Sequence, residues 1–222
     1  MPVIAIASPK GGAGKTTSAF LLATELASRG MKVTVVDADP NHPICQWQDR
    51  GGSTENLTII ENTSEDSVMD DIDEAKKQSD FVIVDLEGTA NLSVAYAIMR
   101  ADFAIIPSQR STLDAGEAAK AISLVKRQSK AIGRDIPSAL LLTRTSPAIR
   151  SKGLKRMLDS LDTNNIDVFT VEVHEREAFK AVFDHSATLK QLKDSDVSGL
   201  EKARFNSAEF GAEVIQKLQE LK

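Results

Sequence analysis

The chain has 222 residues and a mass of 24.0 kDa; 41% of its residues are hydrophobic and 27% are charged, as in an ordinary globular protein. The formal net charge of −5 argues by itself against a nucleic-acid binder. No apolar run is long enough to span a bilayer, no leader is apparent, and one cysteine excludes an internal disulfide or a multi-thiolate metal site. We therefore expect a cytoplasmic protein with a single domain over residues 1–222.

Short apolar runs alternate with helical patterns along the whole chain. The runs are rich in valine and isoleucine, with few polar interruptions, which is typical of strands covered on both faces. We expect strands at 3–7, 32–38, 57–60, 81–85, 103–107, 139–143 and 168–173. We expect helices at 15–29, 64–78, 113–131 and 151–161, and a final helical region within 197–222. This alternation predicts an α/β fold with a doubly wound, largely parallel sheet flanked by helices.

The stretch SPKGGAGKTT, residues 8–17, follows the first predicted strand and opens the first predicted helix. Its glycines allow a tight turn that aims backbone amides inward, as phosphate binding requires. Lys15 would reach the β and γ phosphates of ATP or ADP, and Thr16 would offer its hydroxyl to Mg²⁺. We assign nucleotide binding to Gly11, Gly12, Ala13, Gly14, Lys15, Thr16 and Thr17. The alternative is a plain strand-to-helix turn, since Pro9 stands where the ordinary motif has glycine.

Lys10, five positions before Lys15, is the unusual residue of this loop. K-G-G-A-G-K-T-T resembles the deviant phosphate loop (deviant Walker A) of the ParA/MinD ATPase family. The resemblance implies that Lys10 crosses the interface of an ATP-dependent homodimer and contacts the phosphates held by the other protomer. Such a contact would make dimerisation depend on the bound nucleotide, because a lysine neutralises the dense charge between two ATP molecules. A solvated lysine beside a turn is the alternative.

VVDADP, at residues 35–40, places Asp37 and Asp39 at the carboxyl end of a strand, where ligands of open α/β sheets bind. The stretch resembles the D-x-D-P element of the same family. The resemblance implies that Asp37 supports Mg²⁺ through water and that Asp39 orients the attacking water. Two loop-capping aspartates are the alternative. The family often has glutamine where this chain has Asn41.

FVIVDLEG, at residues 81–88, is a second hydrophobic strand that ends in an acid. It resembles the second acidic element of phosphate-loop ATPases, in which Asp85 would support Mg²⁺ and Gly88 would let a switch segment move. Many chromosomal members carry Pro-Pro after this aspartate, whereas this chain continues with Leu86 and Glu87. The departure points toward short plasmid-type ParA proteins and conjugation-associated relatives.

Charge is unevenly spread: residues 49–80 carry ten acids and three bases, whereas residues 110–156 carry eleven bases and three acids. Similarity to ParA-type proteins implies ATP-dependent, sequence-independent DNA binding, for which basic side chains facing phosphates suffice. We assign this role to Arg150, Lys152, Lys155, Arg156 and Lys180. A solvated helix face is the alternative. LLTR, which ends at Arg144, resembles the family segment beside the adenine, and 174–189 resembles the one that closes over the nucleotide.

The resemblance implies a nucleoid-associated partition ATPase that hydrolyses ATP slowly when a small centromere-binding, ParB-like protein stimulates it. The alternatives are a MinD-like positioning ATPase at a membrane, a conjugation-associated ATPase, and a metabolic enzyme on the same scaffold. We expect no membrane partner, because Glu209, Glu213 and Glu220 interrupt the basic residues of the C-terminal tail. The cargo stays open.

The remaining residues with distinctive chemistry give no further site. His42, His174 and His185 are too far apart in sequence to predict a metal triad by their spacing. We expect Cys45 to be a buried or half-buried bystander and Trp47 to be a packing residue near the switch.

Overall fold

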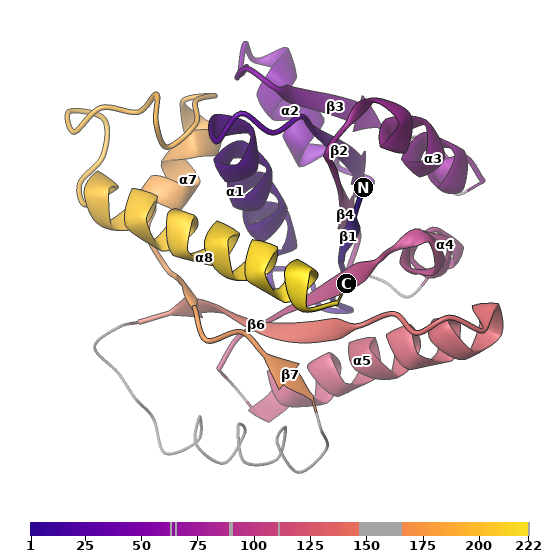
Figure 1. Ribbon diagram of the computed structural model, residues 1–222. Helices are drawn as coiled ribbons and strands as arrows, with labels where there is room; N and C mark the ends of the chain where they lie inside the picture. The colour runs from indigo at the N-terminus through magenta and orange to yellow at the C-terminus, as the bar shows by residue number, and fades with distance from the viewer. Residues whose placement is uncertain (63, 65, 89–90, 111, 147–165, 222) are drawn as a thin grey trace.

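The structure is a computed structural model that describes residues 1–62, 64, 66–88, 91–110, 112–146 and 166–221 (Figure 1). Within these ranges eight strands form one parallel sheet in the order β3-β2-β4-β1-β5-β6-β7, with β8 paired to β6. The strands are β1 (Val3–Ile6), β2 (Val33–Ala38), β3 (Leu57–Glu61), β4 (Phe81–Leu86), β5 (Phe103–Ser108), β6 (Ser138–Thr145), β7 (Asp167–Val168) and β8 (Val173–His174). The helices are α1 (Lys15–Ser28), α2 (Pro43–Asp49), α3 (Val68–Gln78), α4 (Leu92–Arg100), α5 (Thr112–Ile132), α7 (Glu177–Asp184) and α8 (Leu200–Glu220). The predicted doubly wound α/β fold is confirmed.

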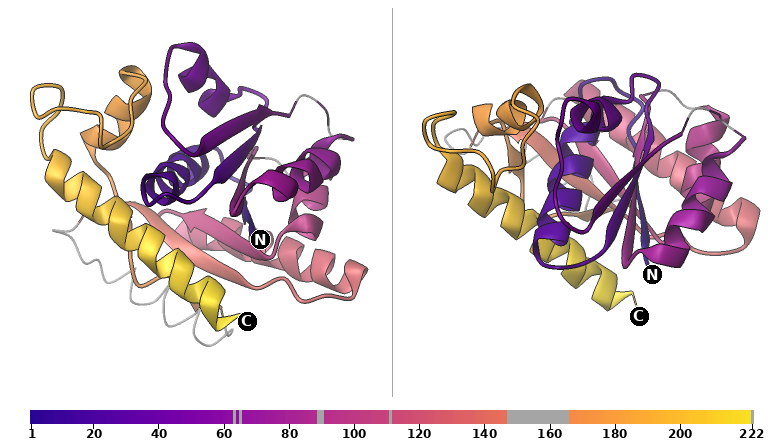
Figure 2. Two further views of the ribbon diagram at one scale, coloured as in Figure 1. Left: turned by 45° about the horizontal axis from the view of Figure 1, so that its top comes forward. Right: turned by 90° about the horizontal axis from the view of Figure 1, so that it is seen from above.

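Helices cover both faces of the sheet, and each face has its own hydrophobic core. Figure 2 shows α1 and α8 on one side of the sheet and α3, α4 and α5 on the other. Successive residues of β1 divide between the two cores: Ile4 and Ile6 join the first, and Val3 and Ala5 join the second. Burial on both faces explains why the strands are continuously apolar in sequence.

Aromatic side chains connect the helices of the first core. Trp47 of α2 is 1% exposed and meets Phe20 of α1 edge to face, with ring centroids 4.9 Å apart. Its indole nitrogen donates to the carbonyl oxygen of Val182 in α7 at 3.1 Å. Trp47 is therefore a packing residue, as predicted, and Cys45 in the same helix is buried as well.

Some boundaries differ from the predictions. The predicted strand 168–173 is divided into β7 and β8, because the amides of Thr170 and Val171 donate to the carboxylate of Glu213 in α8, both at 2.7 Å. The predicted helix 64–78 begins at Val68. The short helices α2, α4 and α7 have seven to nine residues, too few for a clear helical period in sequence. The predicted helix 151–161 lies outside the described residues.

Candidate nucleotide-binding site

The glycine-rich loop joins the carboxyl end of β1 to the first turn of α1. Gly12 has a φ of 75° and Gly14, which caps α1, has a φ of 91°. Both angles lie in the left-handed region that only glycine adopts without strain. A Cβ at Gly14 would also lie 3.3 Å from the Cβ of Thr143 in β6. The glycines thus let the loop turn and pack closely against the neighbouring strand.

A cavity of about 410 Å³ lies over this loop, within the size range of small-molecule sites. Its walls come from the loop, the end of β2 and the segment after β4. Among the predicted site residues it is lined by Gly11, Gly12, Gly14, Lys15, Thr16, Thr17, Asp39 and Arg144. Ala13 is buried behind the loop, where its carbonyl oxygen accepts a hydrogen bond from the Thr143 hydroxyl at 2.7 Å.

Lys15 lines the cavity although its side chain is only 6% exposed. Its Nζ donates to the carbonyl oxygen of Lys10 at 3.2 Å, so the two lysines of the loop are directly linked. Burial lowers the pKa of Lys15, and the carboxylates of Asp85, Asp39 and Glu87 oppose that change. A phosphate group in the cavity would give this partly desolvated ammonium a matching charge-assisted partner.

Asp37 and Asp85 are register partners at the carboxyl ends of β2 and β4, and both are 0% exposed. Oδ2 of Asp37 accepts N–H hydrogen bonds from Ile44 at 2.8 Å and from Cys45 at 3.0 Å. Within the described residues, Oδ1 of Asp37 and both carboxylate oxygens of Asp85 have no hydrogen-bond partner of normal geometry. Buried polar oxygens without donors are rare in folded proteins, so these atoms need an explanation.

The raised pKa values of the two acids show what these oxygens require. Burial raises the pKa of Asp85 to about 8, although the nearby Thr16 hydroxyl opposes the rise, and burial also raises the pKa of Asp37. A divalent cation would reverse these shifts by stabilising the ionised carboxylates. Carboxylate and hydroxyl oxygens are the ligands that Mg²⁺ prefers. The donor set of Thr16, Asp37 and Asp85 therefore fits magnesium.

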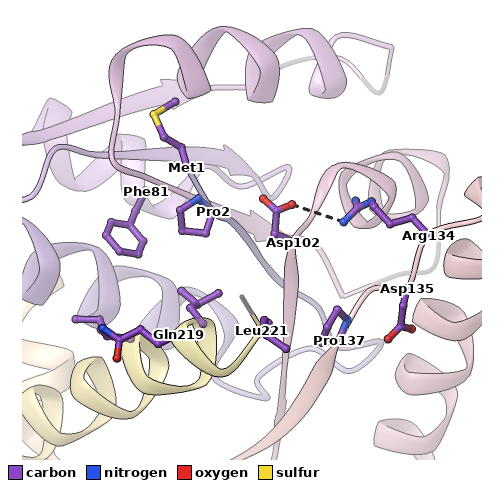
Figure 3. Close-up of a pocket in the computed structure, with 11 residues that line it drawn as sticks. Met1, Pro2, Phe81, Asp102, Arg134, Asp135, Pro137, Gln219 and Leu221 are labelled. Carbon is purple, nitrogen blue, oxygen red and sulfur yellow. Dashed lines mark ion pairs between the residues drawn. The ribbon is translucent and has the colours of Figure 1, made fainter.

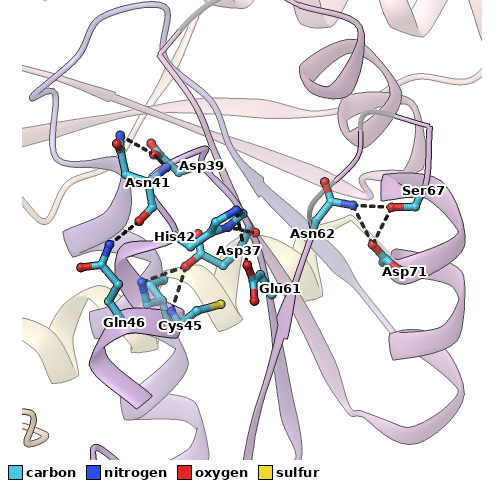
Figure 4. A network of polar contacts seen from close by, with 11 residues as sticks. Asp37, Asp39, Asn41, His42, Cys45, Gln46, Glu61, Asn62, Ser67 and Asp71 are labelled. Carbon is cyan, nitrogen blue, oxygen red and sulfur yellow. Dashed lines mark hydrogen bonds and ion pairs between the residues drawn. The ribbon is translucent and has the colours of Figure 1, made fainter. Parts of the chain in front are cut away.

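Asp39 lies on the wall of the same cavity, beyond the end of β2. Both the backbone N–H and the side-chain amide of Asn41 donate to its Oδ1, at 2.9 and 3.0 Å (Figure 4). Gln46 of α2 in turn donates to the carbonyl oxygen of Asn41 at 2.7 Å. Asn41 thus orients the carboxylate of Asp39.

Two side chains hold the Gly12 peptide. Arg144 donates from Nη1 at 3.2 Å and Gln109 donates from Nε2 at 3.0 Å, both to the carbonyl oxygen of Gly12. Sequence reasoning placed Arg144 near the nucleotide but missed Gln109, which follows β5 at the same edge of the sheet. Arg144 also borders a smaller cavity of about 50 Å³ whose other wall is the segment 173–180, part of the segment predicted to close over the nucleotide.

The segment after β4 approaches the loop closely. A Cβ at Gly88 would lie 3.1 Å from the backbone nitrogen of Gly11, so a side chain there would push the two segments apart. Glu87, which also lines the cavity, accepts a hydrogen bond from the side chain of Asn91. The described residues resume at Asn91, so the switch motion predicted around Gly88 stays a prediction.

The predicted DNA-binding residues are only partly described. Arg150, Lys152, Lys155 and Arg156 lie outside the described residues. Lys180 is exposed on α7 and forms an ion pair with Glu177 one turn earlier, at 3.0 Å. Lys180 lines the smaller cavity together with Arg144 and Arg176.

A larger cavity, of about 700 Å³, lies at the opposite edge of the sheet, between the amino ends of the strands and the end of α8 (Figure 3). Its acid Asp102 accepts the N–H of Val3 at 2.8 Å and pairs with Arg134 at 3.5 Å. These polar groups already stabilise the fold, and the residues that line this cavity include no glycine-rich loop. The chemistry therefore points to the cavity of about 410 Å³ over the glycine-rich loop, at the carboxyl edge.

A parallel sheet whose first strand runs into a glycine-rich loop, with a buried lysine and two buried acids at the same edge, defines a phosphate-loop nucleotide-binding protein. The chain matches the family described as VirC1 protein over residues 1–212 and belongs to this family of ParA/MinD-type ATPases. It is 37% identical over 220 residues to Protein ParA of Rhizobium radiobacter, and the alignment covers 99% of each chain.

Solved structures support the same fold. A plasmid partition protein from Borrelia burgdorferi B31 bound to AMPPNP gives a TM-score of 0.68 at 21% identity and covers 96% of this chain and 99% of its own. The septum site-determining protein MinD from Pyrococcus horikoshii OT3, complexed with Mg-ADP, gives a TM-score of 0.74 at 18% identity, with 100% and 98% covered. Structural neighbours of this chain thus bind nucleotide, and one of them binds it with magnesium. In the part of this chain that is described, no helix is both long and apolar enough to cross a membrane.

Proposed function

We propose that the chain is a ParA-like, Mg²⁺-dependent ATPase that dimerises on ATP, binds DNA without sequence preference, and hydrolyses ATP slowly until a ParB-like centromere-binding partner stimulates it. Its role would be the segregation of plasmid or chromosomal DNA. The observation that carries this proposal is the linked pair Lys10 and Lys15 above two buried acids, Asp37 and Asp85. The 37% identity to a ParA protein supports the direction of the proposal.

The residues have separate roles in this proposal. Backbone amides of residues 11–17 and the ammonium of Lys15 bind the phosphates, while Asp39, held by Asn41, orients the attacking water. Thr16, Asp37 and Asp85 would hold a magnesium ion, which would supply neutralisation of phosphate charge. Arg144 and Gln109 fix the loop through the Gly12 carbonyl oxygen. Phosphoryl transfer needs such positioning and charge stabilisation more than covalent chemistry.

Lys10 is the residue that would connect nucleotide to dimer. Its side chain is exposed while its carbonyl oxygen accepts from the buried Lys15. A phosphate that binds Lys15 competes with this contact, so the backbone at Lys10 can respond to the nucleotide. In the proposed dimer the Lys10 side chain contacts phosphates of the other protomer and acts with Lys15 and Asp39 in catalysis.

DNA retention tests this function. Purified protein would be passed over immobilised duplex DNA of arbitrary sequence at low and moderate salt, with ADP, with ATP and Mg²⁺, and with ATP for Lys10→Ala. We expect retention only with ATP, weakening as salt rises because counterions are released, and lost in Lys10→Ala. Lys77→Ala, which removes an exposed lysine of α3, is the matched control and should behave as the parent. If the protein is retained on the DNA in none of the nucleotide states, the proposed DNA binding is contradicted.

The main alternative is a positioning ATPase with another cargo, whether a conjugation complex or a protein assembly. It is favoured by the Leu86–Gly88 stretch, which lacks the prolines of chromosomal members. Similarity to the protein "Maintenance of carboxysome distribution protein A" of Halothiobacillus neapolitanus, 28% identical over 192 residues, supports it as well. ATP-dependent dimerisation without DNA retention, measured by light scattering in the same buffers, would favour this alternative.

A further inference from the structure

Behind Asp37 the structure gathers three residues of different chemistry. One ligand atom each from Asp37, His42 and Cys45 lies within 4.8 Å of the other two. A carboxylate oxygen, an imidazole nitrogen and a thiol sulfur together form a donor set typical of zinc and similar cations rather than of magnesium. Figure 4 shows the three residues close together where β2 ends and α2 begins. Sequence spacing alone does not predict that these three residues bind a metal. They come together because the chain turns at residues 38–42.

We propose that Asp37, His42 and Cys45 form a binding site for a zinc-class divalent cation, separate from the nucleotide cavity but sharing Asp37 with the magnesium donor set. Glu61 would be a fourth ligand once its side chain, which is 55% exposed, moves toward Asp37 and Cys45. It is the register partner of Asp37 on β3, and its Oε1 lies 3.7 Å from Nε2 of His42. Four protein ligands of this kind complete a tetrahedral zinc site.

The backbone holds His42 in an orientation suited to a ligand. His42 has a φ of 43°, a left-handed conformation that is uncommon for a residue with a side chain. Its Nδ1 lies 3.2 Å from the carbonyl oxygen of Asp37. Metal-binding histidines commonly donate their second ring N–H to a backbone carbonyl, which fixes the tautomer and the ring. With Nδ1–H donating to Asp37, the lone pair is on Nε2, the nitrogen nearest Glu61.

Burial supplies an independent reason for a cation here. Asp37 is fully buried, and its Oδ1 has no hydrogen-bond partner among the described residues. Cys45 is 8% exposed, so the thiol lies in the same low-dielectric region. Tetrahedral zinc with bonds of about 2.0–2.3 Å requires ligand atoms roughly 3.5 Å apart. Ligand atoms that lie within 4.8 Å of one another must therefore close by up to about 1.3 Å. The thiol proton passes to water when the thiolate binds.

Occupation of this site would oppose the nucleotide site. A cation held by His42 and Cys45 draws the Asp37 carboxylate away from magnesium, so zinc would weaken Mg-nucleotide binding, and Mg-nucleotide would weaken zinc binding equally. This consequence rests on the proposed function, whereas binding of the cation itself does not.

Cobalt is the probe, because Co²⁺ occupies zinc sites and its bond to a thiolate gives a near-ultraviolet charge-transfer absorption. The full chain, without nucleotide, would be titrated with Co²⁺ and then with Zn²⁺ as competitor. Since the chain has one cysteine, any thiolate–cobalt band reports on Cys45. We expect the band at one equivalent, its displacement by Zn²⁺, and its absence in Cys45→Ser.

The histidine is tested with a matched pair. His42→Ala should weaken Co²⁺ binding at least about tenfold, whereas His185→Ala, at an exposed histidine after α7, should leave it unchanged. Absence of a thiolate–cobalt band in the parent chain would overturn the proposal without any variant being needed. Equal binding by His42→Ala and His185→Ala would overturn it too. Because no nucleotide is present, neither result depends on the proposed ATPase function.

Discussion

The two edges of the sheet hold acidic residues in opposite conditions. At the amino edge, Asp102 is 40% exposed, accepts a backbone N–H and pairs with Arg134. At the carboxyl edge, Asp37 and Asp85 are fully buried, and three of their four carboxylate oxygens have no hydrogen-bond partner of normal geometry in the described part of the chain. The acid at the amino edge has its hydrogen bond and ion pair within the fold. The acids at the carboxyl edge need a ligand, such as a cation, to complete their interactions.

This difference identifies the functional edge on energetic grounds. Burying an unpaired carboxylate is costly, and its perturbed pKa is more common at functional sites than at structural ones. The same edge carries the loop glycines with positive φ and the buried Lys15. Parallel α/β sheets bind their ligands at the carboxyl ends of the strands, and here the buried acids with raised pKa values lie at those ends. Substitutions at the two edges should therefore have opposite effects on stability and activity.

Lys15→Ala should have the largest effect. Removal of the buried ammonium takes away the charge that stabilises the transferring phosphoryl group, so ATP hydrolysis should fall by about a hundredfold or more. Phosphate release at saturating ATP and Mg²⁺ measures it. Lys77→Ala, at an exposed lysine of α3, should retain the parental rate. Hydrolysis within a factor of two of the parent in Lys15→Ala would remove the carboxyl-edge site from the mechanism.

Asp85→Asn tests the edge comparison directly through the free energy of unfolding. Without Mg²⁺ or nucleotide at neutral pH, folding must either bury the ionised Asp85 carboxylate or protonate it. The neutral amide avoids both costs, so stability should increase by roughly 1–3 kcal/mol. Asp102→Asn should instead decrease stability by roughly 1 kcal/mol, because it weakens a hydrogen bond and an ion pair that the fold uses. Urea unfolding of both variants gives the two values. A change of the same sign in the free energy of unfolding of both variants would contradict the difference between the two edges.

The pH dependence of the parent chain sharpens this test. Because folding raises the pKa of Asp85 from its ordinary 3.8 to about 8, the folded state binds more protons than the unfolded state between these values. The contribution of Asp85 to the free energy of unfolding therefore falls as the pH rises from about 4 to about 8. Asp37, whose pKa is also raised, adds to the same decline. Urea unfolding across this range should give a shallower decline for Asp85→Asn than for the parent.

Addition of ligand should reverse the cost at the carboxyl edge. ADP with Mg²⁺ at ten times its dissociation constant should stabilise the parent by about 1.4 kcal/mol. Chelation of magnesium by EDTA should remove most of that gain, and Asp85→Asn should show little of it. Thermal unfolding with ADP alone, with ADP and Mg²⁺, and with added EDTA measures these differences. An unchanged gain after EDTA would exclude a magnesium role for Thr16, Asp37 and Asp85.

The sequence predicted the sheet and the phosphate loop because both depend on local patterns. Strand composition reflects burial on both faces, and the glycines reflect the φ angles that the loop needs at Gly12 and Gly14. The features that the sequence did not predict depend on contacts between residues far apart in the chain. The break between β7 and β8 requires Glu213, more than forty residues away, and Gln109 contacts Gly12 across 97 positions.

The cluster around Asp37 was missed for a related reason. Cys45 is the one cysteine of the sequence, and His42 is far in sequence from the other two histidines, so spacing predicts no metal motif for either residue. The structure instead joins them to a strand-end aspartate through a turn in which His42 is left-handed. The sequence pattern of this cluster is an aspartate at a strand end, with a histidine five residues later and a cysteine eight residues later. This pattern can be recognised once the structure is known.

The smallest effect that we predict separates two glycines at the two ends of α1. Gly14 and Gly30 both have positive φ, 91° and 86°, so alanine at either position should cost about 1 kcal/mol of stability through backbone strain. Only at Gly14 would the new Cβ also press on Thr143, at 3.3 Å, whereas Gly30 has open space. Gly14→Ala should therefore be somewhat less stable than Gly30→Ala in urea unfolding. It should also lose nucleotide affinity in a fluorescent ATP-analogue titration, which Gly30→Ala should not. Equal nucleotide affinity in the two variants would mean that the close packing of the loop on β6 does not shape the cavity. The positive φ would then be the one reason for a glycine at position 14.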